Sequence, residues 1–339
     1  MRERYIISRD MAKVMVTGAC GQIGSELVME LRRKYGGESI VASDATAGDS
    51  VLACGHKSKP RKDLYDSGPF EFIEVTNRKN MAAIIKDYGI NTVYHLAALL
   101  SARGEKNPQL CWDVNMNGLY NLLEIAREQK LKIFWPSSIA VFGPTTPRDN
   151  TPQETILSPT TMYGISKASG EMLCDYYCKR YGVDVRGVRY PGIISSETLP
   201  GGGTTDYAVA IYYEAIKHKK YTCFVREDTV LPMMYMPDCI RAILELMETD
   251  PSRLKHHSNF NLSAMSFSAG EVAAEIKKHI PEFTCEYKPD FRQAIADSWP
   301  RSLDDSAARE EWGWKPEYDI SKMTEDMIQI LVPRLLSKT

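Results

Sequence analysis

Short apolar runs alternate with amphipathic stretches along the first 192 residues of the chain. The apolar runs predict six strands, at 13–18, 39–44, 70–75, 91–98, 132–138 and 184–192. Helical spacing of apolar residues predicts helices between them, at about 22–34, 77–88, 106–129 and 162–181. Residues 45–69 lack periodicity and contain three glycines and two prolines, so a loop is predicted there. Strands that alternate with helices predict an α/β fold with a Rossmann-type doubly wound parallel sheet.

Beyond residue 192 the pattern is looser. Short strands are predicted at 231–238 and 259–263, and helices at 268–279 and 321–337. These elements predict a smaller C-terminal lobe whose chain returns to the sheet domain. We expect the sheet domain to comprise residues 11–190 and about 225–258, and the lobe to comprise about 191–224 and 259–325. Residues 1–10 are expected to be a disordered lead-in.

Composition and charge narrow the class of protein. The 339 residues are 43% hydrophobic and 25% charged, with a net charge of −2, which argues against nucleic acid or an anionic membrane as partner. No apolar run approaches the ~20 residues that cross a bilayer, and the N-terminus has no secretory signal region. We therefore expect the cytoplasm, or the mitochondrial matrix in a eukaryote. The eight cysteines and six histidines have no metal-ligand spacing, so no metal is expected.

A glycine-rich turn, "TGACGQIG", follows the first predicted strand. Gly18, Gly21 and Gly24 allow a tight turn and close approach of a diphosphate to the N-terminus of the next helix, although a plain strand-to-helix turn is the alternative. Asp44 ends the second predicted strand, 20 residues beyond Gly24. A carboxylate there would accept hydrogen bonds from ribose hydroxyls and repel a 2′-phosphate, which favours NAD over NADP. The alternative for Asp44 is a solvated turn residue.

Tyr163 and Lys167 are four residues apart and share one face of a predicted helix. Tyrosine has a pKa of about 10 and is a poor base at neutral pH. Lowering that pKa to about 7 takes roughly 4 kcal/mol of phenolate stabilisation. An ammonium ~4 Å away supplies about that much at an effective dielectric near 20, so the pair needs a secluded cleft. Ser137 and Ser138 end the fifth predicted strand at the edge where doubly wound sheets bind ligands. Asn115 lies within a predicted helix, where asparagine is unfavourable, which indicates a side chain that holds a backbone group or water.

These residues occur in the order typical of the extended short-chain dehydrogenases/reductases, and the chain resembles that family over nearly its whole length. The resemblance implies NAD as cofactor, a phenolate base at Tyr163, support from Lys167, substrate orientation by Ser138 and a proton relay through Asn115. Glu74 and Val75 would lie beside adenine, although the family has aspartate where Glu74 stands. The full set of cofactor-binding residues implied is Gly18, Gly21, Gln22, Ile23, Gly24, Asp44, Glu74, Val75, Leu96, Ala97, Ala98, Pro136, Ser137, Tyr163, Lys167, Tyr190, Pro191 and Ile193.

Within this family the chain is most similar to the NAD-dependent L-threonine 3-dehydrogenases. The strings "PSSIAVFGPTTPR", "LPGGGTTDYAV", "LPMMYMPDC" and "ADSWPRSLDDSAAR" carry this similarity. It implies zinc-free oxidation of the C3 hydroxyl of L-threonine to L-2-amino-3-ketobutyrate, and a homodimer that pairs through the long helices at about 106–129 and 162–181. The substrate-binding residues implied are Ser101, Ser138, Tyr163, Thr204, Thr205, Asp206 and Trp299. For Trp299 a place in the core is the alternative, and for "GGGTT" a plain loop and helix cap.

Two rival functions stay open at this point. An epimerase or dehydratase acting on a nucleotide sugar would share the whole cofactor half of the chain. A non-catalytic NAD-sensing regulator could use the same fold, although such a protein has no need for Tyr163, Lys167 and Ser138 together.

Overall fold

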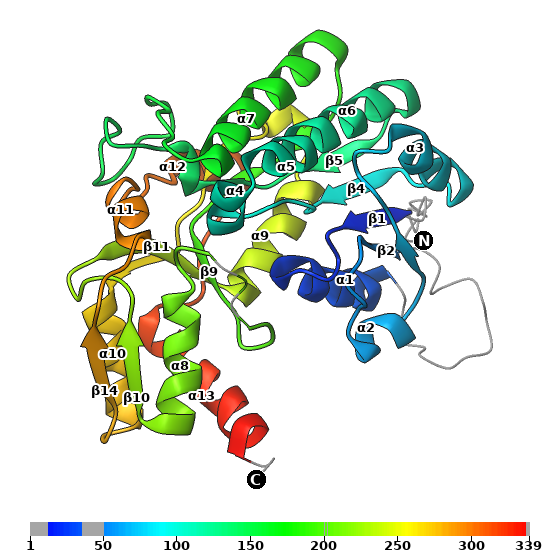
Figure 1. Cartoon of the computed structure of the whole chain (residues 1–339). Coiled ribbons are helices and arrows are strands. Elements are labelled where there is room, and N and C mark those ends of the chain that lie inside the picture. The colour runs from blue at the N-terminus through cyan, green and yellow to red at the C-terminus, as the bar shows by residue number, and fades with distance from the viewer. Residues whose placement is uncertain (1–12, 36–50, 200, 202, 337–339) are drawn as a thin grey trace, which may run out of the picture.

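A parallel six-stranded sheet forms the centre of the protein (Figure 1). The computed structural model describes residues 13–35, 51–199, 201 and 203–336. The strand order is β3-β2-β1-β4-β5-β7. The strands are β1 (Val14–Thr17), β2 (Val51–Gly55), β3 (Phe70–Phe72), β4 (Thr92–His95), β5 (Lys132–Phe134) and β7 (Val185–Arg186). The predicted α/β class with a doubly wound parallel sheet is therefore confirmed.

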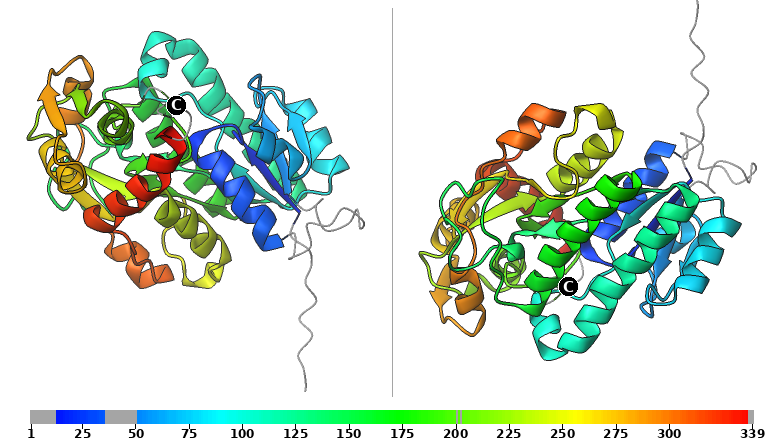
Figure 2. Two further views of the ribbon diagram at one scale, coloured as in Figure 1. Left: turned by 90° about the horizontal axis from the view of Figure 1, so that it is seen from below. Right: turned by 90° about the horizontal axis from the view of Figure 1, so that it is seen from above.

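Alternate residues of β1 face opposite layers of helices. Val14 and Val16 pack in one cluster with α1 (Gln22–Tyr35) and α9 (Met236–Glu248). Met15 packs in a second cluster, which includes side chains of α3 (Arg78–Asp87), α6 (Gly118–Gln129) and α7 (Met162–Tyr181). The helices α6 and α7 lie side by side on that face (Figure 2). Burial on both faces explains why the central strands are mostly apolar.

The prediction of a loop at 45–69 is wrong in part. The place beside β1 is taken by β2, with Val14 opposite Val51 and Thr17 opposite Cys54. The expected loop at 45–69 therefore contains a buried strand, and a short helix, α2 (Lys62–Asp66), follows it. The run "VLACG" is as apolar as the predicted "SIVASD", and the structure pairs it with β1 and β3. Residues 39–44, including Asp44, lie outside the described residues.

The predicted long helix at 106–129 is broken into segments. α4 (Ser101–Lys106) ends before Pro108, where α5 (Pro108–Trp112) begins with Asn107 as its cap. A π-helical turn, η2 (Asp113–Asn117), then joins α5 to α6. Proline fits the first turn of a helix but not its interior, which explains the break. A π-turn is energetically unfavourable and often marks a functional site, and this one contains Asn115.

Three smaller sheets lie beyond the central one. β6 (Ser137–Ser138), β8 (Val188–Tyr190) and β12 (Phe260–Asn261) form the first, in the order β12-β8-β6. β9 (Gly192–Ile194), β11 (Val230–Tyr235) and β13 (Met265–Ser268) form the second, in the order β13-β11-β9. β10 (Lys220–Cys223) pairs with β14 (Thr284–Tyr287) in the third.

The core of the C-terminal lobe lies among three helices that pack on one another. They are α8 (Tyr207–His218), α10 (Ala269–His279) and α13 (Ile320–Leu336), close to the predicted boundaries for the last two. The short helices are η3 (Ile139–Val141), η4 (Pro251–Arg253), α11 (Arg292–Asp297) and α12 (Ser306–Trp312). The predicted division of the chain into a sheet domain and a lobe remains a prediction, and the lead-in at 1–10 lies outside the described residues.

Candidate active site

The glycine turn after β1 leaves no room for side chains. Gly18 has a φ of +72°, and a Cβ there would lie 2.7 Å from the carbonyl carbon of Leu96. A Cβ on Gly24 would lie 2.2 Å from the Gly18 oxygen, and the Gly21 N–H donates to that same oxygen at 2.9 Å. The turn therefore exposes bare backbone at the N-terminus of α1, which begins at Gln22. This cradle fits the diphosphate of a dinucleotide.

The segment after β4 is fixed against the glycine turn. The Thr17 hydroxyl lies 2.9 Å from Nδ1 of His95 and accepts a hydrogen bond from the Ala97 N–H at 3.3 Å. Burial lowers the pKa of His95 to about 3, so its imidazole is neutral. Leu96, Ala97 and Ala98 are half-buried beside the turn, at the same sheet edge.

Ser138 and Tyr163 come together across β6 and the first turn of α7. Thr161 caps that helix by accepting a hydrogen bond from the Gly164 N–H at 3.0 Å, which places Tyr163 next to the cap. Burial raises the pKa of Tyr163 to about 12, and a side-chain hydrogen bond with Ser138 opposes this rise. The surroundings that the protein itself provides therefore keep this phenol protonated at neutral pH. A base would need the opposite change, a lowered pKa.

Lys167 is buried one turn further along α7. Its ammonium donates to the Pro136 oxygen at 2.5 Å and lies 4.5 Å from the centroid of the Trp135 ring. The Tyr163 ring centroid is 5.7 Å from the same Nζ atom. Burial lowers the pKa of Lys167 to about 8. The ammonium and the phenol therefore share one buried environment, in which the charge of the lysine is poorly compensated.

Asn115 ties the segment after β4 to α7. Its Oδ1 accepts from the Leu99 N–H at 2.8 Å, and its Nδ2 donates to the Leu99 oxygen and to the Ser166 hydroxyl, both at 3.1 Å. Asparagine is thus placed in the π-turn to hold a backbone group. Because Ser166 precedes Lys167, the amide also helps to set the position of the lysine.

Strands β8 and β9 connect the remaining cofactor candidates. Ser138 is opposite Tyr190 in the β6–β8 pair, and Pro191 leads directly into β9. The Gln22 side-chain amide donates to the Ile193 oxygen at 3.4 Å, which joins the glycine turn to β9. The Tyr190 hydroxyl donates to the Cys239 oxygen at 3.2 Å, so its side chain is used in the core.

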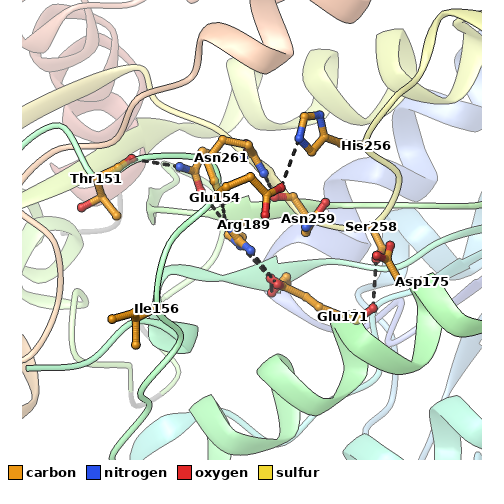
Figure 3. Close-up of polar contacts among 12 residues, drawn as sticks. Thr151, Glu154, Ile156, Glu171, Asp175, Arg189, His256, Ser258, Asn259 and Asn261 are labelled. Carbon is orange, nitrogen blue, oxygen red and sulfur yellow. Dashed lines mark hydrogen bonds and ion pairs between the residues drawn. The ribbon is translucent and has the colours of Figure 1, made fainter. Parts of the chain in front are cut away.

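Four other predicted cofactor residues use their side chains elsewhere. The Ser137 hydroxyl donates to Glu171 at 2.5 Å, within a buried cluster that includes Arg189 (Figure 3). Glu74 forms an ion pair with His56 at 2.7 Å. Val75 is buried against α6, since a Cβ on Gly118 would lie 2.9 Å from its Cγ2 atom. Ile23 is partly buried against the cluster under α1.

Five of the predicted substrate residues lie outside the contact between Ser138 and Tyr163. Thr205 lies against β9, since a Cβ on Gly192 would be 2.8 Å from its methyl carbon. The Thr204 hydroxyl is buried without a hydrogen-bond partner among the described residues, and Asp206 accepts from the Gly203 N–H at 2.7 Å. Trp299 lies in the core of the lobe, where its carbonyl accepts from Arg148 at 3.0 Å. Ser101 is buried at the start of α4.

The sequence analysis missed the cluster that holds Ser137. Arg189 donates twice to Glu171, at 2.9 and 2.8 Å, and also to Asn261 at 3.1 Å (Figure 3). One signal was available: Arg189 lies in an otherwise apolar predicted strand, and a buried arginine requires a charged partner. That partner is 18 residues away on α7, and no local pattern identifies it.

The matching family model is the NAD dependent epimerase/dehydratase family, which matches residues 14–262. An uncharacterized epimerase/dehydratase from Staphylococcus haemolyticus is 50% identical over 323 residues, which cover 95% of this chain and 98% of that protein. L-threonine dehydrogenase from Clostridium difficile is 50% identical, with a TM-score of 0.90 over 96% of this chain and 98% of that one. A monomeric L-threonine 3-dehydrogenase from a metagenome is 51% identical, with a TM-score of 0.88 over 95% of this chain and 99% of that one.

Two further findings apply to the described ranges. They include no group of three or more His, Cys, Asp or Glu residues that could hold a metal ion. Among their helices, none is long and apolar enough to cross a membrane. The compartment stays a prediction. Given the match over most of its length, the chain belongs to the NAD dependent epimerase/dehydratase family.

Proposed function

We propose that this protein is an L-threonine 3-dehydrogenase, which oxidises the C3 hydroxyl of L-threonine to L-2-amino-3-ketobutyrate. The observation that carries the proposal is full-length likeness at about half identity to solved structures of that name. The contact between Ser138 and Tyr163 at the carboxyl edge of the sheet supports it. Bound NAD(P)⁺ would supply the hydride acceptor, and the family description names NAD.

In this proposal Tyr163 accepts the proton of the C3 hydroxyl. Ser138 donates to the C3 oxygen and orients it toward the phenol. The charge of Lys167, whose Nζ lies 5.7 Å from the centroid of the Tyr163 ring, favours the phenolate over the neutral phenol. Burial nevertheless leaves the pKa of Tyr163 raised, at about 12, so the rate should rise with pH through the alkaline range. Asn115 keeps Leu99 and Ser166 in place and would complete the proton path.

The lobe would supply recognition of the amino acid. The buried Thr204 hydroxyl has no hydrogen-bond partner among the described residues, which makes it a candidate for the carboxylate. We keep Ser101, Thr205, Asp206 and Trp299 as further candidates. Trp299 is the weakest of them, because it already packs in the lobe core.

The decisive experiment measures reduced dinucleotide at 340 nm with L-threonine and a panel of 3-hydroxy amino acids. NAD⁺ and NADP⁺ are supplied in parallel reactions, so that the choice of cofactor cannot hide the activity. L-threonine should give the fastest reduction. No reduction with any amino acid, together with interconversion of uridine diphosphate sugars, would replace the proposal with the epimerase that the family description includes. Dinucleotide binding without either reaction would favour a non-catalytic NAD-sensing regulator.

A homodimer is part of this proposal. The face formed by α5, α6 and α7 exposes large apolar side chains: Trp112, Tyr120, Ile165, Met172 and Tyr176. A second copy of the chain would cover them by helix-to-helix packing. Since one relative is named as monomeric, the mass in solution is the test. Sedimentation should give a dimer that Met172→Glu, at 64% exposure, dissociates.

A further inference from the structure

An indole ring faces the ammonium of Lys167. Trp135 directly follows β5, and its backbone N–H donates to the Arg186 oxygen of β7 at 2.8 Å, so its backbone is fixed beside the central sheet. Its side chain is 3% exposed and packs in the cluster that includes side chains of α6 and α7. The Lys167 Nζ atom lies over the ring, 4.5 Å from its centroid. At that distance the negative face of an aromatic ring attracts a cation, and tryptophan does so most strongly.

The helix α7 leaves space for this ring. Gly170 lies three residues beyond Lys167, on the same face of the helix. A Cβ on Gly170 would lie 2.5 Å from both Cζ2 and Cη2 of Trp135, which is far closer than van der Waals contact. Glycine is less favourable than alanine in the interior of a helix. The space that the indole needs therefore explains why glycine stands at this position.

The charge of Lys167 has little compensation from neighbouring ionisable side chains. Those that interact with it or lie beside it are Tyr163, Glu171 and Cys174 on α7, Cys111 on α5 and His95 at the end of β4. The carboxylate of Glu171 is already bound by Arg189 through two hydrogen bonds, at 2.9 and 2.8 Å. Burial raises the pKa of both thiols and lowers the pKa of His95, so these three groups are neutral at pH 7. Besides the Pro136 oxygen, the indole face is therefore the main described neighbour that favours the ammonium form.

We propose that Trp135 is a positioning residue for the reaction, whose indole face keeps Lys167 charged and in place beside Tyr163. The charge of the lysine is what favours the phenolate, so the ring acts on the proton acceptor through the lysine. Without the ring, less of Lys167 is charged near neutral pH, and the chemical step slows while binding of the amino acid changes little. The inference rests on the proposed function, because it concerns the base of that reaction.

The first test measures the charge of the lysine without any substrate. Urea denaturation compares the wild type with Trp135→Leu at about pH 6 and at about pH 9.5. Because burial lowers the pKa of Lys167 to about 8, the folded wild type carries the ammonium at the lower pH and has lost it at the higher one. The unfolded chain carries it at both. The variant should therefore raise the equilibrium constant for unfolding by about tenfold more at the lower pH than at the higher one.

Two further variants make this test decisive. Trp135→Phe keeps the core filled and retains a weaker aromatic face, so it should show the same pH dependence at about threefold. Trp314→Phe is the matched control, because Trp314 is 1% exposed and its ring faces the Arg241 guanidinium at 4.9 Å. Arginine stays charged throughout this range, so the loss of stability should be equal at both pH values. Losses independent of pH in Trp135→Leu and Trp135→Phe would overturn the proposal.

The second test is kinetic and uses L-threonine at about pH 7. Trp135→Leu should reduce kcat by about tenfold and change KM by less than about twofold, and Trp135→Phe should restore most of the loss. Gly170→Ala should also reduce kcat, because its Cβ displaces the same ring without changing the chemistry of the ring. Trp314→Phe should leave kcat unchanged. A kcat of Trp135→Leu equal to that of the wild type would overturn the positioning role. Absence of L-threonine oxidation by the wild type would instead overturn the proposed function, and the comparison of stabilities still decides whether Trp135 holds the charge.

Discussion

Two buried cations close to β6 have very different surroundings. Arg189 has four hydrogen bonds, to both oxygens of Glu171, to the Gln153 carbonyl and to Asn261 (Figure 3). Among the described residues Lys167 donates one hydrogen bond, to the Pro136 oxygen, and its ammonium lies near two aromatic rings. The side chains are almost equally buried, at 3% and 4% exposure. We refer to Gln153, Glu171, Arg189 and Asn261 as the Arg189 cluster, and to Asn115, Ser138, Tyr163 and Lys167 as the catalytic edge.

The difference separates a structural ion pair from a functional charge. A buried cation with a bidentate carboxylate and further acceptors is compensated, so it joins segments far apart in sequence. A buried cation that forms no ion pair has an unfavourable free energy. Burial lowers the pKa of Lys167, and the nearby charge of Glu171 offsets this only in part. Such a cost persists where the charge is needed for a ligand or a reaction. The comparison therefore predicts that changes at the catalytic edge alter activity, and changes in the Arg189 cluster alter stability.

The largest effect is expected for Tyr163→Phe. The substitution removes the proton acceptor and keeps the ring, so turnover with L-threonine should fall by about a thousandfold. Binding of the dinucleotide, measured by calorimetry, and the midpoint of thermal unfolding should change little. Turnover close to that of the wild type would show that Tyr163 is not the base. The catalytic edge would then not differ from the Arg189 cluster in the way proposed.

Glu171→Gln should have the next largest effect, on stability. It leaves the Arg189 guanidinium buried without a countercharge, which costs about 3–5 kcal/mol of unfolding free energy. Urea denaturation measures this loss. Asp175→Asn is the matched control, one turn along the same helix, where the carboxylate pairs with exposed Lys179 at 3.0 Å. That surface pair should contribute less than about 1 kcal/mol. Equal effects of the two variants would contradict the assignment of Arg189.

Local sequence patterns predicted part of this site well. The glycine turn is short, and Tyr163 and Lys167 lie on one helix, so the spacing of these residues determines their neighbourhood. β2 was missed because its residues lie in a stretch without clear periodicity, and only its pairing with β1 and β3 identifies it as a strand. The Arg189 cluster joins residues 18, 36 and 72 positions apart, which no periodicity reveals. The shift of the Tyr163 pKa also depends on tertiary burial. Burial raises this pKa, whereas a phenolate base requires it to be lowered.

Lys167→Met should stabilise the protein while it reduces turnover. The pKa of Lys167 falls from 10.5 to about 8 on folding, which corresponds to about 3 kcal/mol against the charged form. Below pH 8 the lysine is protonated in both states, so the cost is fully present and the variant gains most. Above about pH 10.5 neither state carries the proton, so the gain disappears. The exposed Lys179→Met is the control and should shift stability by less than about 1 kcal/mol. A Lys167→Met variant less stable than the wild type at pH 7 would refute the uncompensated charge.

The smallest and sharpest test uses two adjacent serines, one from each region. The Ser137 hydroxyl donates to Glu171 at 2.5 Å, whereas Ser138 contacts Tyr163. Ser137→Ala should remove about 1–2 kcal/mol of stability, because a hydrogen bond to a buried carboxylate is lost. Ser138→Ala should reduce kcat with L-threonine about ten- to a hundredfold, because the C3 oxygen loses its donor. Its cost in stability should be smaller, about 0.5–1 kcal/mol, because the hydroxyl also accepts a hydrogen bond from the Ala140 N–H at 3.2 Å. Both variants remove one serine Oγ atom, from neighbouring residues. If one mainly loses stability and the other mainly loses turnover, the kind of substitution cannot be the reason. If both lost stability to the same extent with equal loss of turnover, β6 would be a single structural unit, and the distinction between the Arg189 cluster and the catalytic edge would fail.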